Sequence, residues 1–167
     1  SSEDQGFYCL AFHPEFGQAG SPNRDYVYIT YKWKPAGGNG AEAYWRISRF
    51  TVVQQAGKPV ASPASEQILI QQYDRQQWHD SGCMMFGPDG RLYAGATRTR
   101  QIVAYDPAGG APQVVAEDLP SNDLAVSVKG DIYVTDTASK KVWLIPKGGK
   151  RRTVDEGIES PKGVLFS

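Results

Sequence analysis

The sequence repeats itself with a step of about 40 residues, and this repeat limits the folds open to the chain. Gly90 aligns with Gly130, and each of these glycines stands between two short apolar stretches. The stretches lie at 83–86, 123–126 and 163–166 before the glycine position, and at 91–94 and 131–134 after it. A period near 40 made of short strands and glycine turns is typical of the blades of a β-propeller. We therefore predict an all-β chain of propeller type.

An earlier copy of the unit stands near the N-terminus, with a longer internal spacing. The stretch 9–12 is followed by 26–29, and the next copy begins only at 83. We predict that this first unit carries an insertion, with 53–65 as a connection inside it. Strands are expected where aromatic and β-branched residues are bounded by turn residues. They lie at 7–12, 26–31, 45–53, 66–71, 82–86, 92–96, 101–105, 113–116, 124–128, 132–136, 141–145 and 151–154.

The repeat divides residues 1–167 into a partial propeller of about three blades. We expect a long first blade over 1–78, a second over 79–118, a third over 119–157 and the inner strand of a fourth over 158–167. A blade cannot bury both faces of its sheet alone, and propellers close with at least four blades. Three arrangements remain open: a fragment of a longer propeller, two copies that pair to close a ring, or a deletion variant. A longer chain or a second copy would supply the missing blades.

The charge balance argues against two classes of partner. The chain has 18 basic and 18 acidic residues, so its formal net charge is zero. Nucleic acids and anionic membranes attract proteins through an excess of basic residues, which is absent here. The longest apolar runs are only as long as a strand, so we expect no membrane span. The sequence also shows no signal peptide.

Four stretches of the first half of the chain form a recognisable pattern, at 6–16, 26–28, 46–50 and 78–90. Through them, residues 6–95 resemble the soluble glucose/sorbosone dehydrogenase family. This resemblance implies a six-bladed propeller that oxidises aldose sugars with pyrroloquinoline quinone and calcium. It also implies that His79 is the general base that removes the sugar hydroxyl proton, a role that suits an imidazole. The alternative for His79 is a hydrogen bond to the loop before a strand. The family's cofactor-binding arginine and lysine come from later blades, which have no counterpart here.

The second half carries a different pattern, at 91–95, 119–126, 130–137 and 160–164. Through these stretches, residues 91–167 resemble the gluconolactonase/senescence-marker family. This resemblance implies a six-bladed propeller that hydrolyses sugar lactones at a divalent metal on the axis, most often calcium. The two resemblances meet at 86–95, which marks either ordinary kinship among propellers or a junction between two of them.

The lactonase resemblance implies that Asn122 offers its side-chain oxygen to the metal and that Asp123 and Lys162 are candidate substrate contacts. Lys162 departs from the family pattern, which has a second asparagine there, and an ammonium group cannot bind a metal. A lysine near the ion would weaken metal binding unless it turns to solvent or pairs with Asp123. The alternative for Asn122 and Asp123 is to cap a turn through bonds to the backbone.

Cys9 and Cys83 occupy equivalent positions in their units. We expect free, buried thiols, because neighbouring inner strands diverge beyond the reach of a disulfide. A zinc site formed by His79, Asp80 and Cys83 lacks a fourth ligand.

The sequence thus favours a sugar-lactone hydrolase of propeller type, inactive as an isolated fragment. The first alternative is a quinone-dependent aldose dehydrogenase with His79 as its base. The second is a non-catalytic propeller that serves as a scaffold or binding module. The expected ligand is a small sugar or sugar lactone, and both resemblances favour a periplasmic or secreted protein.

Overall fold

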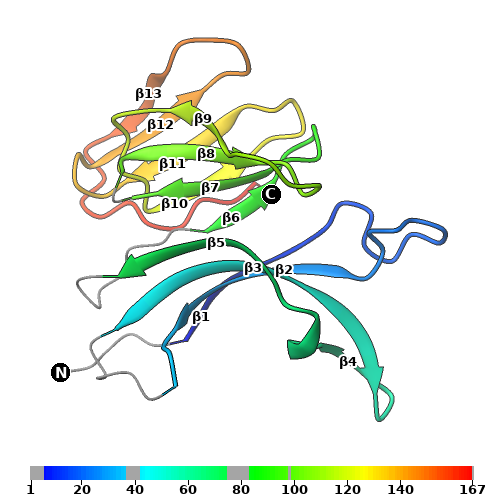
Figure 1. Cartoon of the computed structure of the whole chain (residues 1–167). Coiled ribbons are helices and arrows are strands. Elements are labelled where there is room, and N and C mark those ends of the chain that lie inside the picture. Colours follow the sequence, from blue (N-terminus) through cyan, green and yellow to red (C-terminus); the bar gives the residue numbers. More distant parts are fainter. Residues whose placement is uncertain (1–5, 37–41, 75–82, 98, 167) are drawn as a thin grey trace. The chain divides into compact units, whose positions relative to one another are not determined.

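The computed structural model describes residues 6–36, 42–74, 83–97 and 99–166. It falls into two compact units, Ser1–His79 and Asp80–Ser167, and each is treated by itself. The described residues form antiparallel strands and a single turn of 3-10 helix, η1 (Pro63–Ser65), with no α-helix (Figure 1). The prediction of an all-β chain is therefore confirmed. No described helix has the length and hydropathy needed to cross a bilayer.

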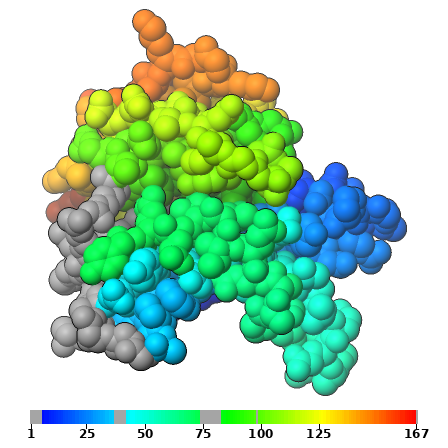
Figure 2. Space-filling model, in the orientation of Figure 1, coloured from blue at the N-terminus to red at the C-terminus, as the bar shows by residue number. Residues whose placement is uncertain are grey.

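The first unit is one antiparallel sheet with a side arm. Its strands are β1 (Phe7–Phe12), β2 (Tyr26–Trp33), β3 (Ala43–Gln55), β4 (Lys58–Ala61) and β5 (Gln67–Asp74). β1, β2, β3 and β5 pair in that order, so they form a meander of four neighbouring strands. β4 pairs only with the last part of β3, beyond the reach of β5. The β3–β4 hairpin projects from the sheet in Figures 1 and 2.

This side arm lies in the stretch 53–65, which we expected to be only a connection. The stretch does link β3 to β5, but it also contains β4 and η1. Ala56 and Gly57 have φ of 51° and 75°, as a two-residue hairpin turn with both residues left-handed requires. Pro59 pairs with Gln54 and lies on the edge strand of the hairpin, where its missing N–H removes no ladder bond.

The second unit contains two similar four-stranded meanders. The first consists of β6 (Met84–Phe86), β7 (Leu92–Ala96), β8 (Gln101–Tyr105) and β9 (Gln113–Ala116). The second consists of β10 (Asp123–Val126), β11 (Ile132–Asp136), β12 (Lys141–Ile145) and β13 (Arg152–Glu156). Each sheet has its strands in chain order, which is the arrangement of a propeller blade.

The two sheets repeat each other down to local irregularities. A β-bulge lies between Ile102 and Val103 in the first sheet, and the second has one between Val142 and Trp143. The loops that lead into β8 and β12 end in equivalent residues with left-handed backbones, at positions 100 and 140, with φ of 56° and 57°. The sequence repeat is therefore a repeat of backbone conformation.

The core of the second unit is shared by its two sheets. Its buried members are Tyr93, Ile102, Ala104, Leu119, Leu124, Val126, Ile132, Val134 and Ile145. β10 contacts both β6 and β7, so each sheet covers an apolar face that the other would leave exposed.

The inner strand expected at 163–166 is not formed. Residues 161–166 belong to no ladder of the described structure. The segment is held by bonds to β10 and β11 instead, as described below. Both cysteines are reduced thiols, with Cys9 buried and Cys83 half-buried.

Candidate functional site

Three loops of the second unit end at the same edge of its sheets. Because the strands alternate in direction, the β7–β8 loop, the β9–β10 connection and the β11–β12 loop all emerge there. They surround a hollow of about 150 Å³, here called the upper hollow. Its lining residues are Thr97, Pro120, Ser121, Asn122, Asp136, Thr137 and Ala138. The sequence-predicted residue Asn122 therefore lies at a real concavity.

Ser121 is the most unusual residue of the upper hollow. Its side chain is 1% exposed, yet its Oγ has no hydrogen-bond partner in the described part of the chain. The serine lies against Gly95 of β7: a Cβ added there would overlap Ser121 Oγ and come within 3.0 Å of Ser121 Cβ. The absence of a side chain at Gly95 thus makes room for this hydroxyl. A buried hydroxyl without a partner is costly, so it points to a missing hydrogen-bonding group.

Two threonine hydroxyls of the upper hollow fix the backbone around it. Thr97 Oγ1 donates to the carbonyl of Ser121 at 2.8 Å, and Thr137 Oγ1 donates to the carbonyl of Pro161 at 2.6 Å. A hydroxyl that donates its one hydrogen retains lone pairs that can accept. Both threonines can therefore still receive a hydrogen bond from a bound molecule.

The carboxylate of Asp136 is occupied by its own loop. It is 4% exposed and accepts bonds from the backbone N–H of Ser139 at 3.1 Å, from Ser139 Oγ at 2.6 Å and from Trp143 Nε1 at 3.4 Å. These donors hold the β11–β12 loop against β12. Asp136 shapes the hollow rather than offering a free charge to it.

The structure separates the roles of Asn122 and Asp123. The Asn122 side chain is exposed, and its backbone N–H donates to the carbonyl of Thr135 at 2.8 Å. The Asp123 carboxylate accepts from the N–H groups of Leu124 at 2.8 Å and Val164 at 2.9 Å. Asp123 therefore holds the C-terminal segment against β10 by a hydrogen bond, whereas the exposed side chain of Asn122 can contact a ligand.

Lys162 belongs to the segment that Asp123 holds. Its carbonyl accepts a bond from Thr135 Oγ1, while its side chain is exposed. Within the described residues Lys162 and Asp123 form no ion pair, and the Asp123 carboxylate accepts from two backbone N–H groups. His79, the predicted general base, lies outside the described residues. Among the residues that are described, no three His, Cys, Asp or Glu side chains gather as a metal site would require.

The sequence interpretation named Asn122, which lines the upper hollow, and did not name Gly95, Thr97, Ser121 or Asp136. Gly95 and Ser121 matter because they meet across two sheets, and no local pattern encodes such a contact. The one available signal was the alignment of the sequence with itself after a shift of one repeat. In this alignment Gly95 corresponds to Thr135, and Ser121 corresponds to Pro161.

The chain is similar to several solved structures, although no protein-family model matches it. A structure of a nidogen/laminin complex matches 95% of this chain and 67% of that chain, with a TM-score of 0.55 and 16% identity. The pyrroloquinoline-quinone-bound aldose sugar dehydrogenase from Streptomyces coelicolor matches over 94% and 48%, with a TM-score of 0.55 and 18% identity. Virginiamycin B lyase from Staphylococcus aureus matches over 97% and 60%, with a TM-score of 0.50 and 11% identity.

At these identities the likeness establishes the fold, which is that of a β-propeller. The chain spans roughly half to two thirds of the length of the structures it matches.

Proposed function

We propose that this chain is part of a propeller that acts on a sugar or sugar lactone, and that the upper hollow holds a hydroxyl-bearing part of that substrate. The observation that carries the proposal is the buried Ser121 hydroxyl, which has no partner in the described part of the chain. The resemblances in both halves of the sequence point to the same substrate class. The hollow is smaller than the pockets of about 300–1,000 Å³ that hold drug-sized ligands, so it suits one end of a monosaccharide.

The hydrogen-bonding groups of the upper hollow match a hydroxylated ligand. Ser121 Oγ has both a hydrogen to donate and lone pairs to offer. Thr97 and Thr137 have committed their hydrogens and can only accept. The exposed carboxamide of Asn122 can do both. A sugar hydroxyl donates and accepts at once, so it can satisfy Ser121 and one neighbour together. An apolar group would leave the serine unpaired.

Hydrolysis of a sugar lactone is the first chemistry that we propose for this propeller. A bound divalent ion would polarise the lactone carbonyl and activate water. Asn122 supplies one neutral oxygen ligand of the kind that calcium accepts. The carboxylates of Asp123 and Asp136 are occupied by hydrogen bonds, so the described residues do not complete a calcium site. The remaining ligands would have to come from residues outside the described part or from further blades.

The alternative chemistry is oxidation of an aldose with pyrroloquinoline quinone. It is favoured by the likeness to the quinone-bound aldose sugar dehydrogenase. No arginine or lysine lines the upper hollow among the described residues, so the cofactor-binding cations would have to come from elsewhere. In this alternative His79 is the general base. A binding module without catalysis is the remaining possibility.

A binding experiment tests the shared part of these proposals. The ¹⁵N-labelled chain is titrated with D-gluconolactam, which resists hydrolysis, and with 2-piperidone, which has the same ring amide but no hydroxyls. We expect saturable shifts at Thr97, Ser121 and Asn122 with the sugar lactam only. Ser121→Ala should abolish them, whereas Lys150→Ala on a distant hairpin should not. Equal shifts with 2-piperidone, or sugar binding that survives Ser121→Ala, would contradict the proposal.

Two activity assays then separate the chemistries. Glucono-δ-lactone hydrolysis is followed with a pH indicator in the presence of calcium, and dye reduction is followed with glucose and pyrroloquinoline quinone. Lactone hydrolysis lost in Asn122→Ala supports the hydrolase. Dye reduction lost in His79→Ala supports the dehydrogenase. Saturable sugar binding without either activity is expected both for the binding module and for an enzyme that still needs further blades.

A further inference from the structure

A second cavity lies at the opposite edge of the second unit. It has a volume of about 250 Å³ and is here called the lower cavity. It opens where β7 and β11 begin and where the β12–β13 hairpin turns, at the strand ends away from the upper hollow. The sugar-directed proposal does not use it.

The floor of the lower cavity is apolar. Ile132 and Ile145 belong to the core shared by the two sheets and are only 2% and 8% exposed. Val115, on β9, adds a half-buried wall, and the ring of Tyr93 adds a flat one. Such a surface gains free energy when it covers an apolar ring or a branched chain.

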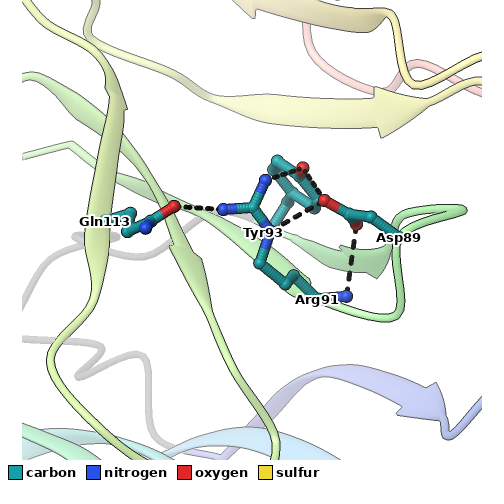
Figure 3. A network of polar contacts seen from close by, with 4 residues as sticks. All are labelled: Asp89, Arg91, Tyr93 and Gln113. Carbon is teal, nitrogen blue, oxygen red and sulfur yellow. Dashed lines mark hydrogen bonds and ion pairs between the residues drawn. The ribbon is translucent and has the colours of Figure 1, made fainter.

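The rim carries a guanidinium that is held in place (Figure 3). Arg91 donates from Nε to Asp89 Oδ2 at 2.7 Å, from Nη2 to Tyr93 OH at 3.2 Å and from Nη1 to Gln113 Oε1. A guanidinium has five N–H donors, and these three bonds use three of them. Two N–H groups of Arg91 are therefore left for another acceptor. Because its orientation is already fixed, binding a ligand there costs little further side-chain entropy.

Asp89 and Tyr93 hold each other and the arginine. Tyr93 OH donates to Asp89 Oδ2 at 2.8 Å. Partial burial acts to raise the pKa of Asp89, but the bonds from Arg91 and Tyr93 outweigh it and leave that pKa below its usual value. Burial and the bond to Asp89 raise the pKa of Tyr93, so this hydroxyl stays protonated. The carboxylate is therefore committed to the network and not free for a cationic ligand.

A second cation reaches the lower cavity from the β12–β13 hairpin. The side-chain stem of Lys147 passes over Gly130, where an added Cβ would lie 3.1 Å from Lys147 Cδ. The backbone N–H of Lys147 donates to Asp131 Oδ1 at 2.9 Å, which anchors the start of the turn. The same hairpin carries Lys150 and Arg151, and it projects as the orange segment in Figure 2. Among the described residues that line the cavity, two are cationic and none is acidic.

We propose that the lower cavity binds a small carboxylate with a flat or branched apolar body. The apolar body would cover Ile132 and Ile145, and the carboxylate would accept from Arg91 and Lys147. Guanidinium and ammonium groups form their strongest hydrogen bonds with carboxylates and phosphates. The apolar floor favours a carboxylate on an apolar body over inorganic phosphate. A volume below that of drug-sized pockets favours a ligand built on one ring.

The test is a calorimetric or NMR titration of the full chain with benzoate, with neutral benzamide as the matched ligand. We expect saturable benzoate binding, at least about fivefold weaker binding of benzamide, and weakening of benzoate binding by salt. Lys147→Ala should weaken benzoate binding about tenfold, as expected for a lost cation–carboxylate bond. Lys150→Ala, on the same hairpin but outside the lining, should change it less than about twofold. Val115→Phe should fill the cavity and abolish binding.

Several outcomes would overturn the proposal. These are no saturable benzoate binding, equal binding of benzamide, or benzoate binding that is unchanged by both Lys147→Ala and Val115→Phe. Far-ultraviolet circular dichroism shows whether each variant folds. If Val115→Phe does not fold, the Lys147→Ala and benzamide comparisons still decide. Ser121→Ala removes the key hydroxyl of the upper hollow and should leave benzoate binding intact, so the two site proposals can fail independently.

Discussion

Gly95 and Ser121 form a contact whose energy can be tested by a double-mutant cycle. Gly95→Ala in the parent chain forces Ser121 to rotate and to move back, because the new Cβ overlaps Oγ and lies 3.0 Å from Ser121 Cβ. Overpacking of this kind costs about 1–3 kcal/mol. Gly95 has no left-handed backbone, so alanine also gains about 0.4–1 kcal/mol by restricting the unfolded chain. We expect a net loss of roughly 0.5–2 kcal/mol of unfolding free energy.

The effect of Gly95→Ala on the free energy of unfolding should change sign when Ser121 is replaced by glycine. Ser121→Gly removes both Oγ and Cβ, and the nearest remaining neighbour of a methyl group added at Gly95 is the carbonyl of residue 121 at 4.0 Å, an ordinary contact. Gly95→Ala should then stabilise the Ser121→Gly chain by about 0.4–1 kcal/mol. The coupling between the two sites is thus about 1–3 kcal/mol, well above the scatter of additive pairs.

Urea unfolding of the four proteins, followed by circular dichroism and tryptophan fluorescence, measures this coupling. Ser121→Ala serves as the control for the hydroxyl alone. It removes a buried group without a partner in the described part of the chain, so it should leave stability unchanged or raise it by up to about 1 kcal/mol. Additive effects of Gly95→Ala and Ser121→Gly would refute the contact on which the upper hollow is built.

Three further predictions concern the whole chain. Calorimetry should find no tight calcium or zinc site at Asn122. Where further blades supply the missing ligands, Lys162→Asn should raise divalent-metal affinity, by less than about tenfold because Lys162 is exposed. Micromolar binding by the parent that Asn122→Ala abolishes would contradict this. Burial lowers the pKa of His13 from 6.5, so the unfolded chain binds the proton more readily and stability should fall as pH drops below about 6.5. His13→Gln should flatten that part of a urea-midpoint profile, and an unchanged slope would exclude the histidine. Sedimentation should show association of the isolated chain, because open blade surfaces favour pairing; a monomer that unfolds cooperatively would argue against it.

The sequence predicted most strands because their signals are local. The alternation of apolar residues and the glycine turns at Gly90 and Gly130 are visible within a few positions. The strand β4 was missed because Pro59 indicates a break unless the strand is known to lie at an edge. Edge position depends on the fold of β3 around it, which the local pattern does not contain.

The candidate sites were less predictable because they arise between sheets. Asn122 was proposed as a metal ligand by resemblance, which stays a prediction, and its exposed side chain lies at the upper hollow. The substrate contact expected of Asp123 stays a prediction, and no local pattern indicated that its carboxylate accepts from the backbone N–H of Val164, far away in the chain. The lower cavity depends on the side chain of Lys147 passing over Gly130. This contact joins the β12–β13 turn to the β10–β11 turn, so it exists only once the two hairpins pack side by side.

The second unit contains two equivalent junctions, where β7 meets the segment at Ser121 and where β11 meets the segment at Pro161. A comparison of the two shows a difference in the hydrogen bonding of their buried hydroxyl groups. Thr97 donates to the carbonyl of Ser121, and one repeat later Thr137 donates to the carbonyl of Pro161, so both junctions share the same backbone contact. They differ in which side supplies the buried hydroxyl. In the first junction the strand has Gly95 and the following segment supplies Ser121. In the second the strand supplies Thr135, and Pro161 stands at the position that aligns with Ser121.

The hydroxyl of Thr135 is fully used within the protein. It donates to the carbonyl of Lys162 and accepts from the N–H of Asp123 at 3.0 Å. This junction therefore closes on itself and holds the segment 161–166 in place of a paired strand. Ser121 has no such backbone within reach in the described part of the chain. The same architecture satisfies one hydroxyl internally and leaves the other buried without a partner in the described part of the chain. The difference between the two junctions therefore lies in side chains rather than in the fold, and it favours ligand binding at Ser121.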